Sequence, residues 1–354
     1  MKQKFVSILM VTISILLALL LVFIIFFNNT FNSPISRTTL IKKEKAPTNW
    51  EFELLYSDIN LSSTSKVTYS SDSIKINTDI LSPYASGFLE TSYLNNLLEI
   101  INSHRSLTGL SPIYSIFSHH KFDNSTIVST SSGLDTLYII DETTNSIFSP
   151  FLVSDSCFLP QYVYDIIEDR DNYYILTAGV NNLAARLFCL SKESLILSEV
   201  WHLTTDDTAL SDMQYTLLNS STALFTNSNG VEISNGTIIP LDFSPEFLFN
   251  NNKNTVGVKI KNDQILVALI DNSTLSLVKT TSFVALSPNL SIVDGMVDSN
   301  YLYLFTYDPH HPNYRYYLNI YNLDTNELIL CEALSDYNNL RILNITTPPL
   351  NSIK

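Results

Sequence analysis

"YLYLFTYDPHHPNYRYYLNIYNL" (Tyr301–Leu323) holds seven of the chain's 19 tyrosines and a histidine doublet between two prolines. In its first seven residues the odd positions are aromatic and the even positions are Leu, Leu and Thr, so each set shares one face of a strand. The run 316–321 alternates in the same way. Large apolar side chains on both faces are typical of a strand that is buried on both sides. The stretch therefore predicts two strands joined by a Pro-rich loop.

The same unit recurs along the chain: a polar turn, a hydrophobic strand, a second turn rich in Asp, Ser or Asn, and another strand. The copies span residues 133–150, 170–200, 220–241, 262–280 and 298–333. Their hairpin turns fall near Glu142, Lys192, Asn235, Asn272 and Thr325, at intervals of 50, 43, 37 and 53 residues. A period of about 40–50 residues built from short strands is the spacing of blades that must stack to bury their apolar faces.

Three segments resemble parts of β-propeller blades. "DNYYIL" (171–176) and "NYLYLF" (300–305) resemble the entry from a polar turn into an inner strand, and "YNLDTNELIL" (321–330) resembles the outer hairpin. The resemblance covers residues 130–333. It implies an all-β fold, a β-propeller of about 6–8 blades, with an irregular β-sandwich as the alternative.

One segment has a different period. "FLETSYLNNLLEIINSHRS" (88–106) places Leu94, Leu97, Leu98 and Ile101 at helical spacing. It predicts the one short helix of an otherwise all-β domain.

The N-terminus predicts a membrane anchor. Residues 5–27 form an apolar run of 23 residues without a charged side chain. As a helix it would span about 34 Å, enough for a hydrocarbon core of about 30 Å. It is longer than the apolar region of a signal peptide, and no small-x-small cleavage pattern follows it. We expect residues 1–4 to be a cytoplasmic tail and 5–27 an uncleaved transmembrane signal-anchor helix.

Residues 28–47 read as a polar, basic linker, because they contain Pro near both ends and show no periodicity. Lys2 and Lys4 favour a cytoplasmic N-terminus, although the basic residues of the linker argue the opposite; these are Arg37, Lys42, Lys43 and Lys45. We expect a single-pass protein of the cell membrane, with residues 48–354 as its extracytoplasmic domain. The linker could also lie along anionic headgroups or wall polymer.

The net charge argues against nucleic-acid binding, and the cysteine content argues against a disulfide framework. Residues 48–354 carry 14 Lys and Arg against 33 Asp and Glu, a net charge of −19. Such a domain would repel phosphate backbones, so we expect no nucleic-acid partner. Cys157, Cys189 and Cys331 are widely spaced and flanked by apolar residues, which favours buried small side chains over a disulfide framework, although one pair could still bridge. The composition is typical of an envelope protein from a low-GC bacterium.

Two histidine doublets offer metal ligands. Each lies beside a carboxylate, in SHHKFD (118–123) and YDPHHP (307–312), and imidazoles with carboxylates are the ligand set of zinc and similar metals. Adjacent residues of a strand point to opposite faces, so a site would need one histidine from each doublet. The candidate ligands are His310, Asp308 and His120. The alternative without a metal is that these histidines are exposed in loops. For the acidic cluster EDRD (168–171), a solvated turn is favoured over calcium binding.

The tyrosine-rich strands offer an aromatic platform for a glycan or a peptide, with packing between blades as the favoured alternative. The candidate residues are Tyr301, Tyr303, Tyr307, Tyr317 and Tyr321. Motifs for phosphate cradles, a nucleophile elbow, the HExxH zinc site and EF-hands do not occur, so we expect no cofactor. We expect a non-catalytic domain that binds an envelope protein or a wall polymer. The alternative is a glycan-cleaving enzyme on the same scaffold, which would need two facing carboxylates.

Overall fold

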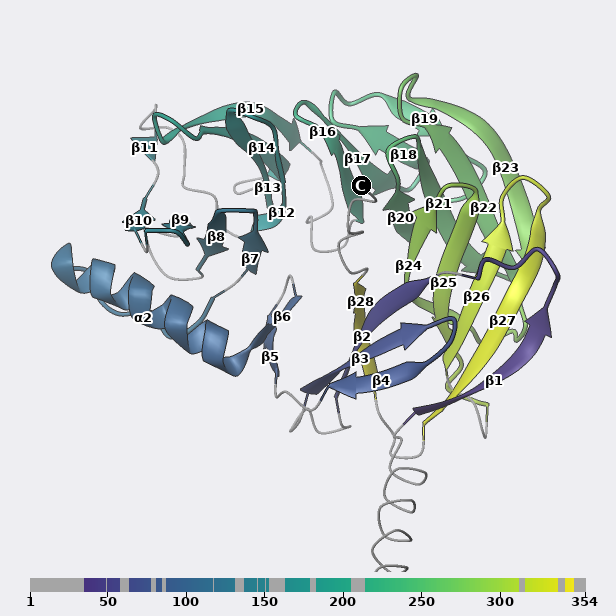
Figure 1. Ribbon diagram of the computed structural model, residues 1–354. Helices are drawn as coiled ribbons and strands as arrows, with labels where there is room; N and C mark the ends of the chain where they lie inside the picture. The colour runs from purple at the N-terminus through teal and green to yellow at the C-terminus, as the bar shows by residue number, and fades with distance from the viewer. Residues whose placement is uncertain are drawn as a thin grey trace, which may run out of the picture.

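Six sheets of four or five strands follow one another along the chain and stand around a common axis (Figure 1). The computed structural model describes residues 35–48, 50–57, 64–77, 81–84, 87–116, 118–130, 137–144, 146–149, 151–152, 163–178, 183–204, 214–311, 316–336 and 341–346. Each sheet is one blade, and the innermost strands contact one another from blade 2 through blade 6 and between blades 6 and 1. The described residues form an all-β propeller of six blades with one helix, which confirms the propeller and the short helix of the predicted fold class.

Blades 2 to 5 are each built from four consecutive strands that pair as antiparallel neighbours. Blade 2 comprises β7 (Ser118–Lys121), β8 (Ser125–Ser129), β9 (Leu137–Asp141) and β10 (Ser146–Phe148). Blade 3 comprises β12 (Val163–Glu168), β13 (Asn172–Ala178), β14 (Leu183–Ser191) and β15 (Ile196–Thr204), with β11 (Phe151–Leu152) added in parallel at its outer edge. Blade 4 comprises β16 (Tyr215–Asn219), β17 (Thr222–Asn227), β18 (Gly230–Ile233) and β19 (Ile238–Pro240). Blade 5 comprises β20 (Phe247–Asn250), β21 (Asn254–Lys261), β22 (Gln264–Asp271) and β23 (Ser276–Val284).

Both ends of the described chain close the ring. Blade 6 comprises β24 (Ser291–Asp298), β25 (Tyr301–Tyr307), β26 (Tyr316–Asn322) and β27 (Glu327–Asp336), and the first strand, β1 (Ile35–Lys42), pairs with the outer edge of β27 (Figure 1). Blade 1 comprises β2 (Glu51–Ser57), β3 (Thr64–Ser70) and β4 (Ile74–Asn77), and the last strand, β28 (Arg341–Thr346), is its innermost strand. The chain thus enters on the last blade and ends on the first.

The outer hairpins carry the predicted repeat. The turns after β9, β14, β18, β22 and β26 fall at the five predicted positions, which confirms the period read from the sequence. The hydrogen bonds at the turns are also shared. Asp271 Oδ1 accepts the backbone N–H groups of Ser273 and Thr274, and Asn322 Oδ1 accepts those of Asp324 and Thr325. In blades 2, 3, 5 and 6, the residue after the third strand also donates its N–H to the carbonyl of the residue that precedes the second strand, as Asn272 does to Lys253.

The predicted helix is present as α2 (Thr91–Leu107), between the hairpin of β5 (Leu81–Tyr84) and β6 (Gly87–Glu90) and blade 2. Leu97 and Ile101 are buried against Tyr138 of blade 2, as the helical spacing predicts. At its start, Tyr93 donates to Glu142 in the outer hairpin of the same blade. Among the described residues, no helix is long and apolar enough to cross a membrane.

A buried polar contact fastens blade 6 to blade 1. Glu332 of β27 is 5% exposed and accepts the hydroxyl of Tyr69 from β3. Thr39 and Arg37 of β1 reach the same carboxylate, and Arg37 also donates to the carbonyl of Ser70. The contact therefore joins β1, β27 and β3, the strands that meet where the ring closes.

The structure corrects the domain boundary near the N-terminus. The region 28–47 was expected to be linker, but eight of its residues form β1 and the propeller domain therefore begins before residue 48. The reason is local: ISRTTLIK is rich in Ile and Thr, which favour strands, and its residues pair in register with β27. The predicted tail 1–4 and anchor 5–27 lie outside the described residues.

Candidate functional site

The five candidate tyrosines divide between the two faces of blade 6. Tyr303 is 3% exposed and packs with Phe52 of blade 1, with ring centroids 5.5 Å apart. Tyr301 and Tyr307 pack against the same cluster, between blades 6 and 1. These three side chains fill the space between two blades.

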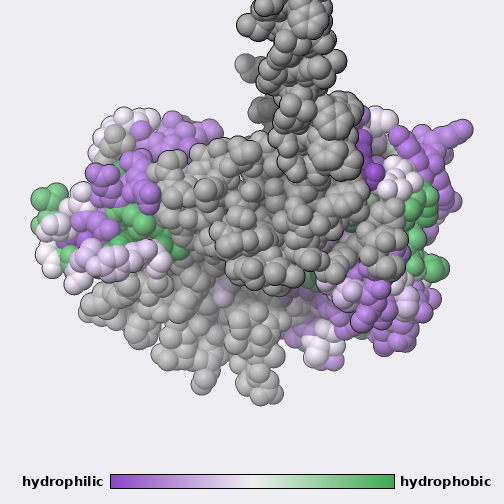
Figure 2. Space-filling view, turned by 90° about the horizontal axis from the view of Figure 1, so that it is seen from below, coloured by the Kyte–Doolittle hydropathy of each residue, from purple (hydrophilic) through white to green (hydrophobic). Residues whose placement is uncertain are grey.

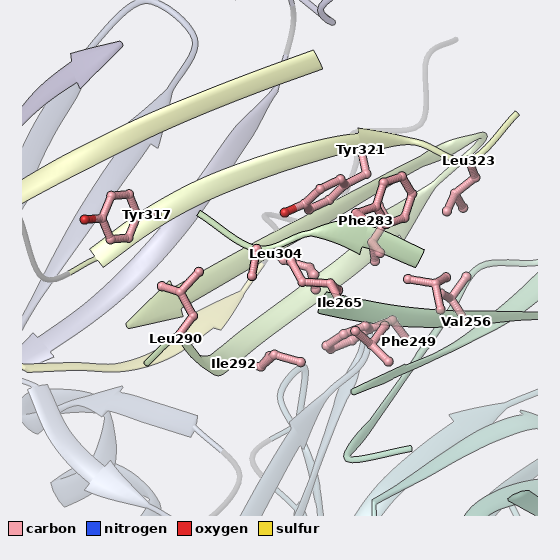
Figure 3. Packing of buried hydrophobic residues seen from close by; sticks show 14 of the residues in the cluster. Phe249, Val256, Ile265, Phe283, Leu290, Ile292, Leu304, Tyr317, Tyr321 and Leu323 are labelled. Carbon is pink, nitrogen blue, oxygen red and sulfur yellow. The ribbon is translucent and has the colours of Figure 1, made fainter. Parts of the chain in front are cut away.

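Tyr317 and Tyr321 point the other way, into the cluster between blades 5 and 6 (Figure 3). Tyr321 is fully buried, and its ring centroid lies 4.4 Å from that of Phe283 on β23. Burial raises the pKa of Tyr321, and its hydroxyl has no hydrogen-bond partner among the described residues. The structure therefore does not bring the five tyrosines into one platform, and their positions favour the packing alternative.

The candidate metal ligands lie in two blades. Asp308, at the end of β25, is buried and accepts the N–H of His310 at 2.9 Å, while His310 itself is exposed. Burial would raise the pKa of Asp308, but hydrogen bonds from Ser287 and from the backbone of His310 and His311 lower it overall. The carboxylate thus closes the loop as a turn acceptor.

His120 lies on β7, the innermost strand of blade 2. Its Nε2 is buried without a partner among the described residues, and burial followed by the charge of His119 lowers the pKa of His120 to about 4. The structure does not bring His120 together with Asp308 and His310. In the part of the chain that it describes, no group of three or more His, Cys, Asp or Glu side chains could hold a metal ion.

The acidic cluster EDRD and the cysteines have structural roles. Asp169 caps the turn between β12 and β13 by accepting the N–H groups of Asp171 and Asn172, and Lys192 pairs with Glu168. Cys331 is a buried free thiol, as its apolar flanks predicted, and burial raises its pKa to about 12. Cys189 is also free, and Cys157 lies outside the described residues.

Two aspartates that were not predicted as site residues occupy equivalent bulges on inner strands. On β12, the pairing with β13 skips Tyr164, and Asp165 Oδ1 accepts the N–H of Ile166 at 2.8 Å. On β24, the pairing skips one residue in the same way, and Asp294 Oδ1 accepts the N–H of Gly295 at 2.7 Å. Bulges re-aim side chains and are frequent next to active sites. Blades 3 and 6 stand opposite each other in a ring of six.

The neighbours of Asp165 indicate that it faces the axis. Val163 and Ile166 pack between blades 2 and 3, whereas Tyr164 and Ile167 pack between blades 3 and 4. Asp165 lies between these two pairs on β12, the strand at the inner edge of its blade. Burial raises the pKa of Asp165 to about 6, against the lowering effect of its backbone hydrogen bond.

Tyr215, on the inner strand of blade 4, completes this inner-edge cluster. Its ring centroid lies 5.4 Å from that of Tyr164, and burial followed by the charge of Asp165 raises the pKa of Tyr215. A carboxyl group that changes charge near pH 6, beside tyrosines, can hydrogen-bond a polar ligand or transfer a proton. A sequence signal was present: Asp165 and Asp294 each precede by 12 residues a threonine that pairs at the bulge, Thr177 and Thr306.

The surface in view from below shows no single dominant apolar area. Figure 2 shows mostly hydrophilic surface over the described residues, with smaller hydrophobic areas at the two sides. A shallow groove of about 400 Å³ runs along α2 and is lined by Asn96, Glu99, Ile100, Ser103, His104, Leu107 and Ile147. It contains none of the sequence candidates.

No family model matches the chain, and no curated protein matches it either. Several solved structures resemble it in fold. Dihydro-heme d1 dehydrogenase NirN is 14% identical with a TM-score of 0.42, and the match covers 80% of this chain and 58% of that one. TolB from Acinetobacter baumannii is 11% identical with a TM-score of 0.36, and the match covers 82% of this chain and 65% of that one. AztD from Citrobacter koseri is 12% identical with a TM-score of 0.35, and the match covers 83% of this chain and 88% of that one. At these scores the likenesses say nothing about function; the propeller rests on the sheet topology.

Proposed function

We propose that the chain is a single-pass membrane protein whose propeller lies outside the cytoplasm and binds an envelope protein or a wall polymer without catalysis. One observation carries the proposal: the propeller begins at Ile35, with seven residues between it and the apolar run 5–27. A rigid closed ring on so short a tether acts only near the membrane. From Ile35 onward the chain carries 18 Lys and Arg against 34 Asp and Glu, and this net charge of −16 favours a basic partner or basic groups on a polymer.

The topology is tested with a membrane-impermeant maleimide on intact cells. Ser273 lies exposed in an outer hairpin, so Ser273→Cys is expected to react from outside at a level above the wild-type protein. Gln3→Cys, in the predicted tail, should react only after permeabilisation. Protection of Ser273→Cys in intact cells would refute the extracytoplasmic location.

Binding is tested with isolated cell walls and with cross-linking in cells. The full-length protein should sediment with the walls or cross-link to an envelope protein. A protein that does neither would refute a binding role.

A second candidate, glycan cleavage, is favoured by one observation. A carboxyl group with a pKa of about 6, such as Asp165 has, suits a general acid near neutral pH. If this candidate holds, the protein releases reducing ends from wall glycan and Asp165→Asn abolishes the release. Absence of release by the wild-type protein would refute it.

A further inference from the structure

The strand directions define two faces of the ring. The turn face carries the outer hairpin turns, including those at 272–275 and 323–326. The opposite face, which we name the entry face, holds the start of β1, because β1 is antiparallel to β27 and Ile35 pairs with Asp336 at the far end of that strand. Any anchor that precedes Ile35 therefore reaches the propeller at the entry face.

The tether is much shorter than the sequence alone indicated. With residues 28–47 as linker, about 20 residues could reach roughly 70 Å. With β1 fixed in blade 6, only seven residues separate Phe27 from Ile35, and they reach at most about 25 Å. A domain of this size is about 50 Å across. The propeller therefore cannot turn over freely on its tether.

The basic residues of the former linker lie away from the start of β1. Lys42 is seven residues after Ile35, about 23 Å along the strand, and Lys43 and Lys45 follow it at the turn face. Lys43 pairs with Glu327 at 3.1 Å. These lysines therefore cannot hold the domain against headgroups while the anchor enters at Ile35.

The entry face beside β1 presents two joined loops. Val284 ends β23 and residues 285–287 follow it, while residues 308–311 follow β25; Asp308 is hydrogen-bonded to Ser287 between the two loops. Val284 is 77% exposed and Leu286 41% exposed. A register row, Tyr307–Tyr316–Leu334–Arg37, links the second loop to β1 over three strand spacings, roughly 14 Å.

We infer that the entry face is turned to the lipid bilayer, with Val284 and Leu286 against the headgroup region and the histidine doublet beside them. The turn face, with its polar hairpins and the lysines that follow β1, is then presented to the envelope partner. The inference rests on the proposed anchoring. It assigns to the loop at 308–311 a place at the membrane surface in place of a metal site.

Two matched tryptophan variants test the inference in full-length protein reconstituted into nanodiscs. Leu286→Trp probes the entry face, and Leu277→Trp, at the opposite end of β23 and 38% exposed, is the control. The two positions are nine residues apart, about 30 Å along the strand. Energy transfer to a dansyl-labelled lipid headgroup is measured as the increase over the wild-type protein, whose Trp50 and Trp201 give the baseline.

We expect at least threefold more added transfer from Leu286→Trp than from Leu277→Trp. Equal transfer from both variants would refute the inference while leaving the anchoring intact, and so would stronger transfer from Leu277→Trp, the mark of a reversed orientation. Contact of this surface with a second copy or a protein instead of lipid would also appear as equal, low transfer. Failure of the full-length chain to enter nanodiscs would refute the anchoring itself, and with it the inference.

Discussion

Removing the hydroxyl group of buried Tyr69 should lower stability, whereas removing that of buried Tyr321 should raise it. Tyr69 donates to Glu332 across the junction of blades 1 and 6. Tyr69→Phe keeps the ring, which packs 5.1 Å from that of Trp50, but removes a hydrogen bond to a buried charge. Such bonds contribute about 1.5–3 kcal/mol, and among the described residues Glu332 would keep Thr39 and the more distant Arg37 as partners. We expect a loss of about 2 kcal/mol in the free energy of unfolding.

Tyr321→Phe is the matched control. The hydroxyl of Tyr321 is buried without a partner among the described residues, so its removal should stabilise the protein by about 1 kcal/mol. Urea unfolding of the full-length protein in detergent, followed by Trp50 fluorescence, measures both. For a slope of about 3 kcal/mol per M, the midpoint falls by about 0.7 M for Tyr69→Phe and rises by about 0.3 M for Tyr321→Phe. Equal effects of the two variants would refute the assigned role of the Tyr69–Glu332 contact.

Three further predictions concern single residues. The folded-state pKa of Asp165 is raised to about 6, so its ionisation costs stability as pH rises from about 4 to 6. Asp165→Asn should therefore stabilise the protein by up to about 3 kcal/mol at pH 7.5 and little at pH 4. An equal effect at both pH values in urea unfolding would contradict this. The pKa of His120 is lowered to about 4, so the stability that its neutral form contributes above pH 6.5 is lost as pH falls towards 4. His120→Gln should reduce that loss by up to about 3 kcal/mol. An unchanged dependence of the unfolding free energy on pH would disprove the burial of His120 as its cause. Gly230 has φ 141°, and a Cβ there would clash with the carbonyl oxygen of Ile239, so Gly230→Ala should cost more than about 3 kcal/mol. Gly236→Ala, at φ 83° in open space, should cost about 1 kcal/mol. Thermal unfolding that ranks the two variants the other way would count against the described backbone.

The blade repeat could be predicted from the sequence because each outer hairpin needs the same local chemistry. A side-chain oxygen accepts one or two backbone N–H groups at the turn, so Asp, Asn or Ser recurs there at blade spacing. The alternation in 301–307 likewise predicted a strand buried on both faces, and the structure confirms it. The helix 88–106 was found because Leu97 and Ile101 recur at helical spacing.

The ring closure could not be predicted, because it depends on pairing between residues almost 300 positions apart. Nothing local in 35–42 indicates that its partner is β27, and its lysines and position after an apolar run favour a linker. Blade 1 was missed for the same reason, since its innermost strand comes from the other end of the chain. The bulge aspartates were missed because a bulge changes where one side chain points without changing the composition of the strand.

The pairing of β1 with β27 is the central claim, since the closed ring, the short tether and the orientation at the membrane all depend on it. In this register Ile41 lies directly opposite Cys331, and both side chains face the cluster between blades 5 and 6. Opposed residues of antiparallel strands lie about 4.5–5.5 Å apart at Cα, within reach of a disulfide. In Ile41→Cys, oxidation followed by alkylation in denaturant and intact-mass measurement should reveal a bond to Cys331. Leu40→Cys, exposed and outside the register, should form none. A free, alkylated Cys331 in the oxidised Ile41→Cys protein would contradict the account.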